Sequence, residues 1–308
     1  MQNIFQQTIK KSVEFKGIGL HSGKISSVKL TSAPENQGII FKRTDIKKEN
    51  IIKADYKNVT SAKLCTTLEN NSGIKVSTVE HLLAAFYIAG VDNIIVEIDN
   101  EEVPIMDGSS SDFIKILKES GISQQKSKRK FLKILSKVKL EDGSRTISVE
   151  PGDLTFEVKF QLNYSNNIIG HQENSINFSY DNLKDVYSSR TFCIFEDIEK
   201  IKKIGLAKGG SLKNAIVVDE DKVINEDGLR NEKEFVNHKI LDLAGDFLLS
   251  GYRILGKVDC HQGGHQLSNV FLRKLLISKS SYTLIELDEN QLSKNREAQE
   301  PIKLAVNA

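Results

Sequence analysis

The stretch FVNHKILDLAGDF, residues 235–247, has the periodicity of a helix but carries three titratable side chains on one face. His238, Asp242 and Asp246 are spaced four residues apart, and residues at this spacing lie one above another on a helix. Most other positions are apolar: Phe235, Val236, Ile240, Leu241, Leu243, Ala244, Phe247 and Leu248. A helix that is apolar on its remaining faces is expected to be buried. The stretch therefore predicts a buried helix over residues 233–250 whose polar face needs a partner.

Two interpretations of this polar face remain open at the level of the helix. It could be a solvent-facing stripe with Lys239 alongside, because amphipathic surface helices are the commonest kind. It could instead hold a metal through His238 and Asp242, with Asp246 orienting a neighbouring group. Burial of a carboxylate without a partner is costly, so a buried helix favours the metal.

A second His beside an acidic residue occurs at Glu80 and His81, in STVEHLLAAFYIAG. The apolar spacing predicts a helix that begins near Ser77 and stops at Gly90. Ser77 and Glu80 fit a capping box, in which the Glu side chain reaches back to the helix N-terminus. Alternatively, His81 supplies a metal ligand and Glu80 a base.

The histidines of CHQGGHQLSN, His261 and His265, have the spacing of a zinc-binding HxxxH pair. Such a pair ligates zinc only on a helix, and the two intervening glycines argue against one. His265 is better placed just after a tight turn, at the start of a helix over about 264–276. His171 lies in a polar stretch without other candidate ligands.

The composition limits the class of protein. In 308 residues, 39% are hydrophobic and 27% charged, which is ordinary for a soluble globular protein. The net charge of +2 is too small to suggest nucleic-acid binding. The three cysteines, Cys65, Cys193 and Cys260, form no CxxC pair, which favours a reducing compartment. No signal peptide or membrane span is visible, so we expect a cytoplasmic protein.

The order of elements predicts an α+β fold with two similar halves. Strand-like runs are followed by a helix both before and after the basic segment KSKRKFLK. We place a first domain at 1–125, a linker at 126–132 and a second domain at 133–288. FLKILSKVKL, residues 131–140, is expected to form a strand. Residues 289–308 are polar without a clear period and are expected to be a loose tail.

Seven segments together resemble the zinc-dependent UDP-3-O-acyl-N-acetylglucosamine deacetylases of lipid A biosynthesis. In chain order they are GIGLHSG, STVEHLLAA, VDNIIVEIDNEEVPIMDGSSSDF, SSRTF, GLAKGGSLKNAIVV, NEDGLRNEKEFVNHKILDLAGDF and GGHQLSN. Each segment alone is a weak signal, but the series runs from about residue 8 to about residue 276. Its order and extent make the resemblance specific.

The resemblance implies roles for individual residues. The zinc ligands would be His81, His238 and Asp242. The catalytic residues would be Glu80 as general base, His265 oriented by Asp246, and Thr191 near the oxyanion. The substrate-contacting residues would be Lys239, Phe192, His21 near the diphosphate, Tyr164, and five residues of a passage for the fatty chain: Ile198, Gly210, Ser211, Ala215 and Val217.

The resemblance also implies two α+β halves packed as a sandwich, with the active site between them and a small βαβ insert at about 195–220. The expected activity is removal of an acetyl group from an acylated UDP-glucosamine by a monomer. Asn237 replaces a usual arginine, and Asn163 precedes Tyr164 where many members have Asp-Phe, which leaves the nucleotide contacts less defined. Two other functions fit the residues: an iron(II) oxygenase with two histidines and a carboxylate, and a non-catalytic module that binds a nucleotide-linked lipid. Glu80 beside His81 favours hydrolysis.

Overall fold

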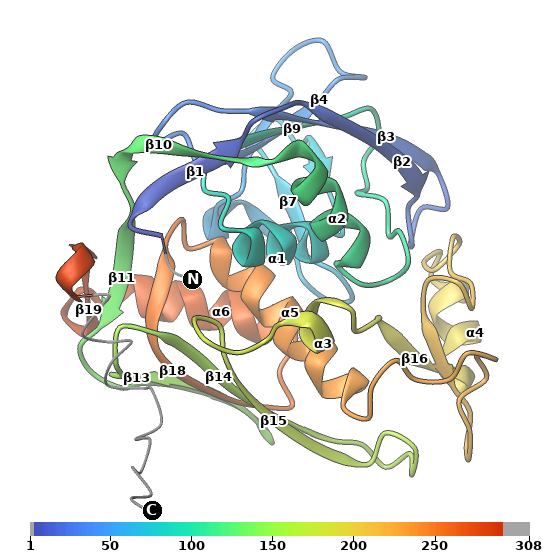
Figure 1. The fold of residues 1–308 in the computed structure, drawn as a ribbon. Helices are drawn as coiled ribbons and strands as arrows, with labels where there is room; N and C mark the ends of the chain where they lie inside the picture. Colours follow the sequence, from blue (N-terminus) through green and yellow to red (C-terminus); the bar gives the residue numbers. More distant parts are fainter. Residues whose placement is uncertain (1–2, 292–308) are drawn as a thin grey trace, which may run out of the picture.

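A computed structural model of the chain describes residues 3–291 and shows a layered α+β fold. The main helices lie between two sheets, one built before residue 100 and the other after residue 129 (Figure 1). One hydrophobic cluster includes residues of both parts, such as Phe86 and Phe247. The predicted α+β class is confirmed, and the division into two domains stays a prediction.

The N-terminal sheet has five strands in the order β2-β3-β9-β4-β5. Burial alternates along β3, as expected for a strand with one face on the core. Only β4 and β9 run parallel. The bounds are β2 Val13–Ile18, β3 Ile25–Ser32, β4 Ile39–Arg43, β5 Ile51–Lys53 and β9 Ile94–Ile98. Two small sheets flank it: β1 (Phe5–Ile9) with β10 (Ile122–Lys128), and β6 (Val59–Ser61), β7 (Thr67–Glu69) and β8 (Lys75–Val76).

The C-terminal sheet has seven strands around β18, Arg253–His261. This strand pairs antiparallel with β13 and parallel with β11 and β14. The other bounds are β11 Lys130–Ile134, β12 Val138–Asp142, β13 Arg145–Glu150, β14 Phe156–Asn163, β15 His171–Asn177 and β19 Tyr282–Glu286.

The helices between the sheets carry the candidate site. They are α1 Glu80–Ala89, α2 Ser111–Ser120, α3 Lys184–Tyr187, α5 Glu234–Leu248 and α6 His265–Ile277. Two short 3-10 helices, η1 Tyr56–Asn58 and η2 Lys279–Ser281, also occur. Every residue of α5 except Lys239 is buried. Of the two interpretations left open, the solvent-facing stripe is therefore wrong, because α1, α3, α6 and strands β14, β15 and β18 of the C-terminal sheet pack against this helix.

Helices α1 and α5 approach each other at Gly245. A Cβ atom at this position would lie 2.1 Å from the main-chain oxygen of Glu80. Only a glycine allows two backbones to come so close. Gly245 thus sets the distance between the two helices that carry His81 and His238.

A small βαβ unit forms the insert expected near 195–220. Strands β16 (Phe192–Ile194) and β17 (Ile216–Val218) pair in parallel, and α4 (Phe195–Lys203) connects them. Its loop contacts the N-terminal part, where the Gly209 amide donates to the Leu20 carbonyl at 3.0 Å. The insert therefore packs beside the segment that contains His21.

Two details of the prediction differ from the structure, and a third is not tested by it. The run FLKILSKVKL is two strands, β11 and β12, which are not neighbours, because the chain turns at residues 135–137. Residues 126–132 lie in β10 and β11 with Arg129 between them, and no unstructured stretch separates the two parts there. Residues 292–308 of the expected tail lie outside the described part.

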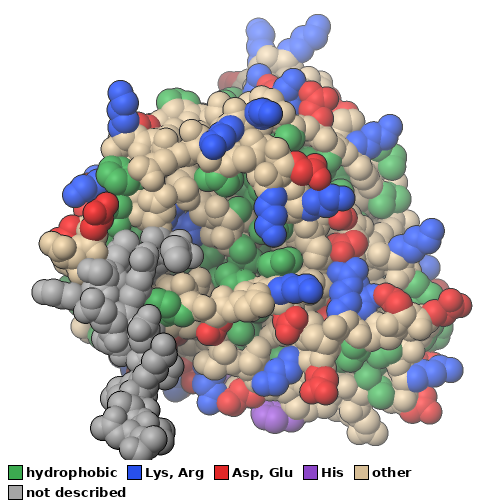
Figure 2. All heavy atoms as spheres, viewed as in Figure 1, with side chains coloured by type: hydrophobic (Ala, Val, Ile, Leu, Met, Phe, Trp, Pro, Cys, Tyr) green, Lys and Arg blue, Asp and Glu red, His purple; other side chains and the backbone are tan. Residues whose placement is uncertain are grey.

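The face of the molecule drawn in Figure 2 carries many charged side chains. Basic and acidic side chains are interspersed across this face (Figure 2). Within residues 3–291, none of the helices combines the length and hydropathy that a membrane span requires.

Candidate metal centre

Three buried side chains from two helices converge between the sheets. His81 comes from α1, and His238 and Asp242 from α5. One potential ligand atom of each lies within 4.8 Å of the others. The Nε2 atoms of both imidazoles are 3.4 Å from Asp242 Oδ1. The polar face of α5 is thus completed by a residue far away in the sequence.

The donor set fits a divalent metal ion. Asp242 Oδ1 is buried and has no hydrogen-bond partner among the described residues, a state that is costly without a cation. His238 Nδ1 faces the Ser189 carbonyl oxygen at 3.1 Å, which leaves Nε2 directed at the carboxylate. Metal-binding histidines commonly donate their other ring N–H to a carbonyl in this way.

The protonation states also suit ligands. Burial lowers the pKa of His238 to about 3, so its ring is neutral at pH 7 and Nε2 can coordinate. Burial raises the pKa of Asp242, but His238, Lys239 and His265 outweigh it and hold that pKa well below its usual range. Asp242 is therefore an anion.

Glu80 is turned toward this centre and not toward the start of its own helix. Its Oε2 atom accepts the Thr66 amide N–H at 3.0 Å, while Oε1 lies 3.6 Å from His265 Nε2. The capping box is wrong: α1 begins at Glu80 itself, and the Ser77 hydroxyl donates to the Glu101 carbonyl. Burial raises the pKa of Glu80, as suits a group that accepts and returns a proton.

His265 is the first residue of α6 and lies between Asp246 and the centre. Its Nδ1 atom is 2.9 Å from Asp246 Oδ2, and its Nε2 atom is 3.9 Å from Asp242 Oδ2. Burial lowers the pKa of His265, but Asp246, Glu80 and Asp242 outweigh burial and raise it to about 10. His261 ends strand β18, with Nδ1 near the Ser144 carbonyl, and does not join the centre.

Two residues that the sequence analysis did not single out complete the arrangement. The Thr66 hydroxyl donates to Asp246 Oδ1 at 2.7 Å, and its amide binds Glu80. Ser189 acts through its backbone carbonyl on His238. A contact through a main-chain oxygen does not depend on residue type, and Thr66 in LCTT has no spacing that distinguishes it from Thr67.

Lys239 and Phe192, two of the expected substrate contacts, border the metal ligands. Lys239 Nζ lies 3.0 Å from Asp242 Oδ2 and 5.3 Å from the Phe192 ring centroid. The Tyr164 ring lies 5.9 Å from that of Phe192. Both ring nitrogens of His21 are buried without a hydrogen-bond partner within residues 3–291, and burial lowers the pKa of this imidazole. His21 is thus a buried polar group with unused donor and acceptor capacity.

Thr191 and the five insert residues are not joined to the metal ligands by hydrogen bonds in the described chain. Thr191 binds through its backbone, donating to the Gly108 carbonyl at 2.8 Å and accepting from the Ile216 amide at 2.8 Å. The insert residues follow it along the chain: half-buried Ile198 on α4, exposed Gly210 and Ser211, and buried Ala215 and Val217.

Comparisons with known proteins identify the family of the chain. The family model "LpxC: UDP-3-O-acyl N-acetylglycosamine deacetylase" matches residues 6–277. A UDP-3-O-acyl-N-acetylglucosamine deacetylase of Shewanella frigidimarina is 39% identical over 306 residues, covering 98% of this chain and 97% of its own. A protein of the same name from Haemophilus ducreyi is 40% identical over 291 residues, covering 94% and 95% of the two chains. The chain therefore belongs to the UDP-3-O-acyl N-acetylglycosamine deacetylase family.

Proposed function

We propose that the protein is a zinc-dependent hydrolase that removes the N-acetyl group from UDP-3-O-acyl-N-acetylglucosamine in lipid A biosynthesis. The observation that carries this proposal is the buried group His81, His238 and Asp242 with Glu80 and His265 directed at it. The names of the relatives support the substrate. We expect the enzyme to act as a cytoplasmic monomer.

The chemistry divides between the ion and the flanking residues. His81, His238 and Asp242 would hold the zinc ion, which when bound would polarise the substrate carbonyl and lower the pKa of water. Glu80 takes a proton from the water that attacks the acetamide carbon. His265 Nε2 carries a proton, because Asp246 raises its pKa, and donates it to the sugar nitrogen as the C–N bond breaks. The products are acetate and a free amine.

Other residues orient the substrate and stabilise charge. The Thr191 hydroxyl contributes to stabilising the oxyanion of the tetrahedral intermediate. Lys239, Phe192 and Tyr164 bind the sugar nucleotide beside the metal ligands, and His21 approaches its diphosphate. The fatty chain lies along the insert, against Ile198, Gly210, Ser211, Ala215 and Val217.

Acetate release from the acylated sugar nucleotide tests the proposal. The purified protein should release acetate, lose this activity with a chelator and regain it with Zn²⁺. Because two histidines and a carboxylate also hold iron(II) in oxygenases, a second aliquot receives Fe²⁺ and oxygen consumption is followed. Oxygen consumption without acetate release would refute the hydrolase and favour the oxygenase.

The Glu80→Ala variant tests whether Glu80 acts as a base and not as a metal ligand. This variant should keep its zinc, since Glu80 is not one of the three ligands, and lose about 10²–10⁴-fold in turnover. Ser77→Ala is the control, because its hydroxyl contacts only the Glu101 carbonyl in the described chain. Turnover of Glu80→Ala close to that of Ser77→Ala would remove Glu80 from the mechanism.

A further inference from the structure

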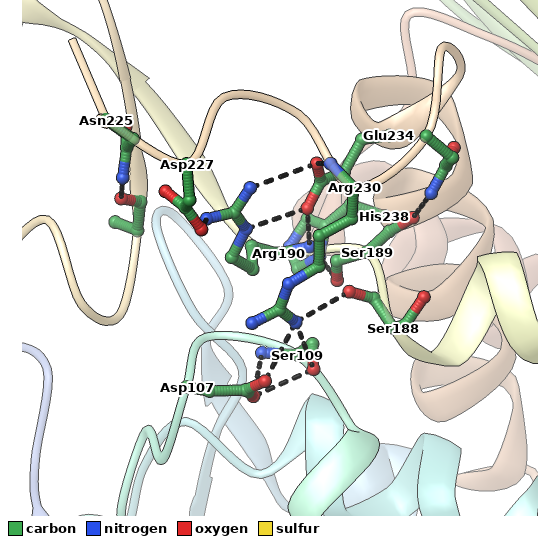
Figure 3. Close-up of polar contacts among 12 residues, drawn as sticks. Asp107, Ser109, Ser188, Ser189, Arg190, Asn225, Asp227, Arg230, Glu234 and His238 are labelled. Carbon is green, nitrogen blue, oxygen red and sulfur yellow. Dashed lines mark hydrogen bonds and ion pairs between the residues drawn. The ribbon is translucent and has the colours of Figure 1, made fainter. Parts of the chain in front are cut away.

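A fully buried arginine lies directly before Thr191, outside the metal ligands and their flanking residues. Only 2% of the Arg190 side chain is exposed, and every nitrogen of its guanidinium donates a hydrogen bond to another residue. Nε donates to Glu234 Oε1 at 2.9 Å, Nη1 to Asp227 Oδ2 at 2.9 Å, and Nη2 to the Gly228 carbonyl at 2.6 Å and Glu234 Oε2 at 3.2 Å (Figure 3). Arg190 is therefore held in one position.

Glu234 collects contacts from two loops at the start of the metal-bearing helix. It is the first residue of α5 and its side chain is fully buried. Besides the guanidinium, it accepts the backbone N–H of Arg190 at 3.0 Å and of Arg230 at 2.6 Å. A carboxylate at this end of a helix is also favoured by the helix dipole. Glu234 thus binds the main chain of Arg190 at the N-terminus of α5.

The contacts of Arg190 and Glu234 lead back to a metal ligand on the same helix. His238 lies one turn after Glu234 on α5, and its Nδ1 atom contacts the carbonyl of Ser189, the residue next to Arg190 (Figure 3). The orientation of this carbonyl follows from where the main chain at Arg190 is fixed. A carbonyl opposite Nδ1 holds the proton there and leaves Nε2 free to coordinate.

A buried ion pair is by itself weak evidence for stability, since the cost of desolvation can exceed the attraction. This pair differs from other buried pairs because Arg190 directly follows Ser189, whose carbonyl contacts the ligand His238. We propose that Arg190 and Glu234 are positioning residues of the metal centre, which hold the Ser189 carbonyl against His238 Nδ1 and so set the affinity for a divalent ion. This inference rests on the metal site of the proposed function.

Zinc affinity of the full-length protein, measured by competition with a chromophoric chelator, tests the inference. Glu234→Gln keeps the shape of the side chain and removes its charge, and Arg190→Lys keeps the charge and removes the fork. Loss of a partner that orients a ligand typically costs 10–100-fold in metal affinity, and we expect this range for both variants. The absorption spectrum of the Co²⁺-loaded protein should change as well, because the geometry at His238 is altered.

A second ion pair, between buried Arg129 and half-buried Asp92, provides a control. Arg129 and Asp92 are 5% and 17% exposed and 2.6 Å apart, and Arg129 also binds the Gly90 carbonyl, at the end of α1 away from His81. Asp92→Asn should lower the free energy of unfolding and leave the zinc affinity of the folded protein unchanged. If Glu234→Gln does not fold, Arg190→Lys carries the comparison.

The outcomes separate this inference from the proposed function. Variants that lose stability as Asp92→Asn does, but bind Zn²⁺ as tightly as the wild type, would show that the pair is only structural and overturn the inference. A wild type that binds neither Zn²⁺ nor Fe²⁺ would overturn the proposed function and the inference together. Weaker binding in both variants, with an altered Co²⁺ spectrum, supports the positioning role.

Discussion

At the scale of single residues, Thr66 links the two carboxylates that flank the metal centre. Its amide binds Glu80 and its hydroxyl binds Asp246, which in turn binds His265. One residue from the N-terminal part therefore influences the geometry of both groups that exchange protons in the proposed mechanism.

Thr66→Val should lower kcat with little change in KM or zinc content. The substitution keeps the shape and the amide contact to Glu80, but it removes the hydroxyl from Asp246 Oδ1. Hydrogen bonds to charged groups contribute about 1.5–3 kcal/mol, so a loss of kcat of roughly ten- to a hundredfold is the upper range. Thr66→Ser restores the hydroxyl and should recover most of the activity. Equal kcat values for the Val and Ser variants would contradict this role.

Sequence alone could identify some residues of the centre but not others. The i, i+4 spacing of His238 and Asp242 is visible because a helix converts spacing into position. Thr66 binds Asp246 from a loop, and Ser189 contacts His238 through its backbone carbonyl, so neither contact has a characteristic residue pattern.

At the scale of elements, the contact between α1 and α5 controls whether the ligands meet. Gly245 lets the two backbones approach, and His81 lies on one helix while His238 and Asp242 lie on the other. A side chain at residue 245 would push the helices apart without altering any ligand.

Gly245→Ala should therefore weaken zinc binding and destabilise the protein. In an exposed helix this substitution stabilises by about 0.5–1 kcal/mol, but here the added Cβ meets the rigid Glu80 main-chain oxygen. Overpacking of this kind costs about 1–3 kcal/mol. Urea unfolding and zinc competition measure both effects. Gly152→Ala, where the nearest atom would be the Lys257 side chain at 3.0 Å, serves as control. A Gly245→Ala protein as stable as this control would contradict the argument.

The βαβ insert leads to a prediction about the fatty chain. If Ile198 lines its path, Ile198→Ala should reduce kcat/KM for a long-chain substrate more than for a short-chain one. A buried methylene contributes about 0.8 kcal/mol, which is roughly fourfold per group. Lys200→Ala on the same helix, whose side chain is 72% exposed, should change neither value. An unchanged ratio of long-chain to short-chain kcat/KM in Ile198→Ala would exclude this residue from the path.

At the scale of the whole molecule, an ion pair joins the N-terminal part to the segment before α5. Asp107 Oδ2 accepts from Arg230 Nη1 at 2.8 Å. Burial raises the pKa of Asp107, but hydrogen bonds from Ser109 and Arg230 outweigh burial and lower it. The folded state therefore favours the ionised carboxylate.

This shift predicts how stability depends on pH. A lowered pKa stabilises the fold above the unfolded value of about 3.9, and the contribution disappears as the pH falls through the folded pKa. The difference in free energy of unfolding between wild type and Asp107→Asn should hence be constant from pH 7 to about 5 and shrink below about 4. Urea titrations of chelator-treated protein avoid the pH dependence of metal binding. A difference that grows on acidification would have the wrong sign.

The fold as a whole followed from the sequence where local patterns decide structure. The spacing of apolar residues predicts a helix over 233–250, and α5 runs from Glu234 to Leu248. The basic run at 126–132 follows a polar stretch, which predicts a linker, but the residues that bind Arg129 lie elsewhere in the chain. Arg129, between β10 and β11, is buried and binds Asp92 and the Gly90 carbonyl. The sequence of the run itself does not indicate either partner.

The distribution of the ligands along the chain has a consequence for biosynthesis. A ribosome adds about 5–20 residues per second, so a nascent chain presents His81 well before His238 and Asp242 exist. One imidazole alone does not hold a metal ion tightly. It also does not select among divalent ions, because selectivity comes from the geometry of a complete ligand set. Stable uptake thus waits until α5 has been synthesised and has docked on α1. We expect the ion to be acquired after translation, from the pool that the folded protein meets.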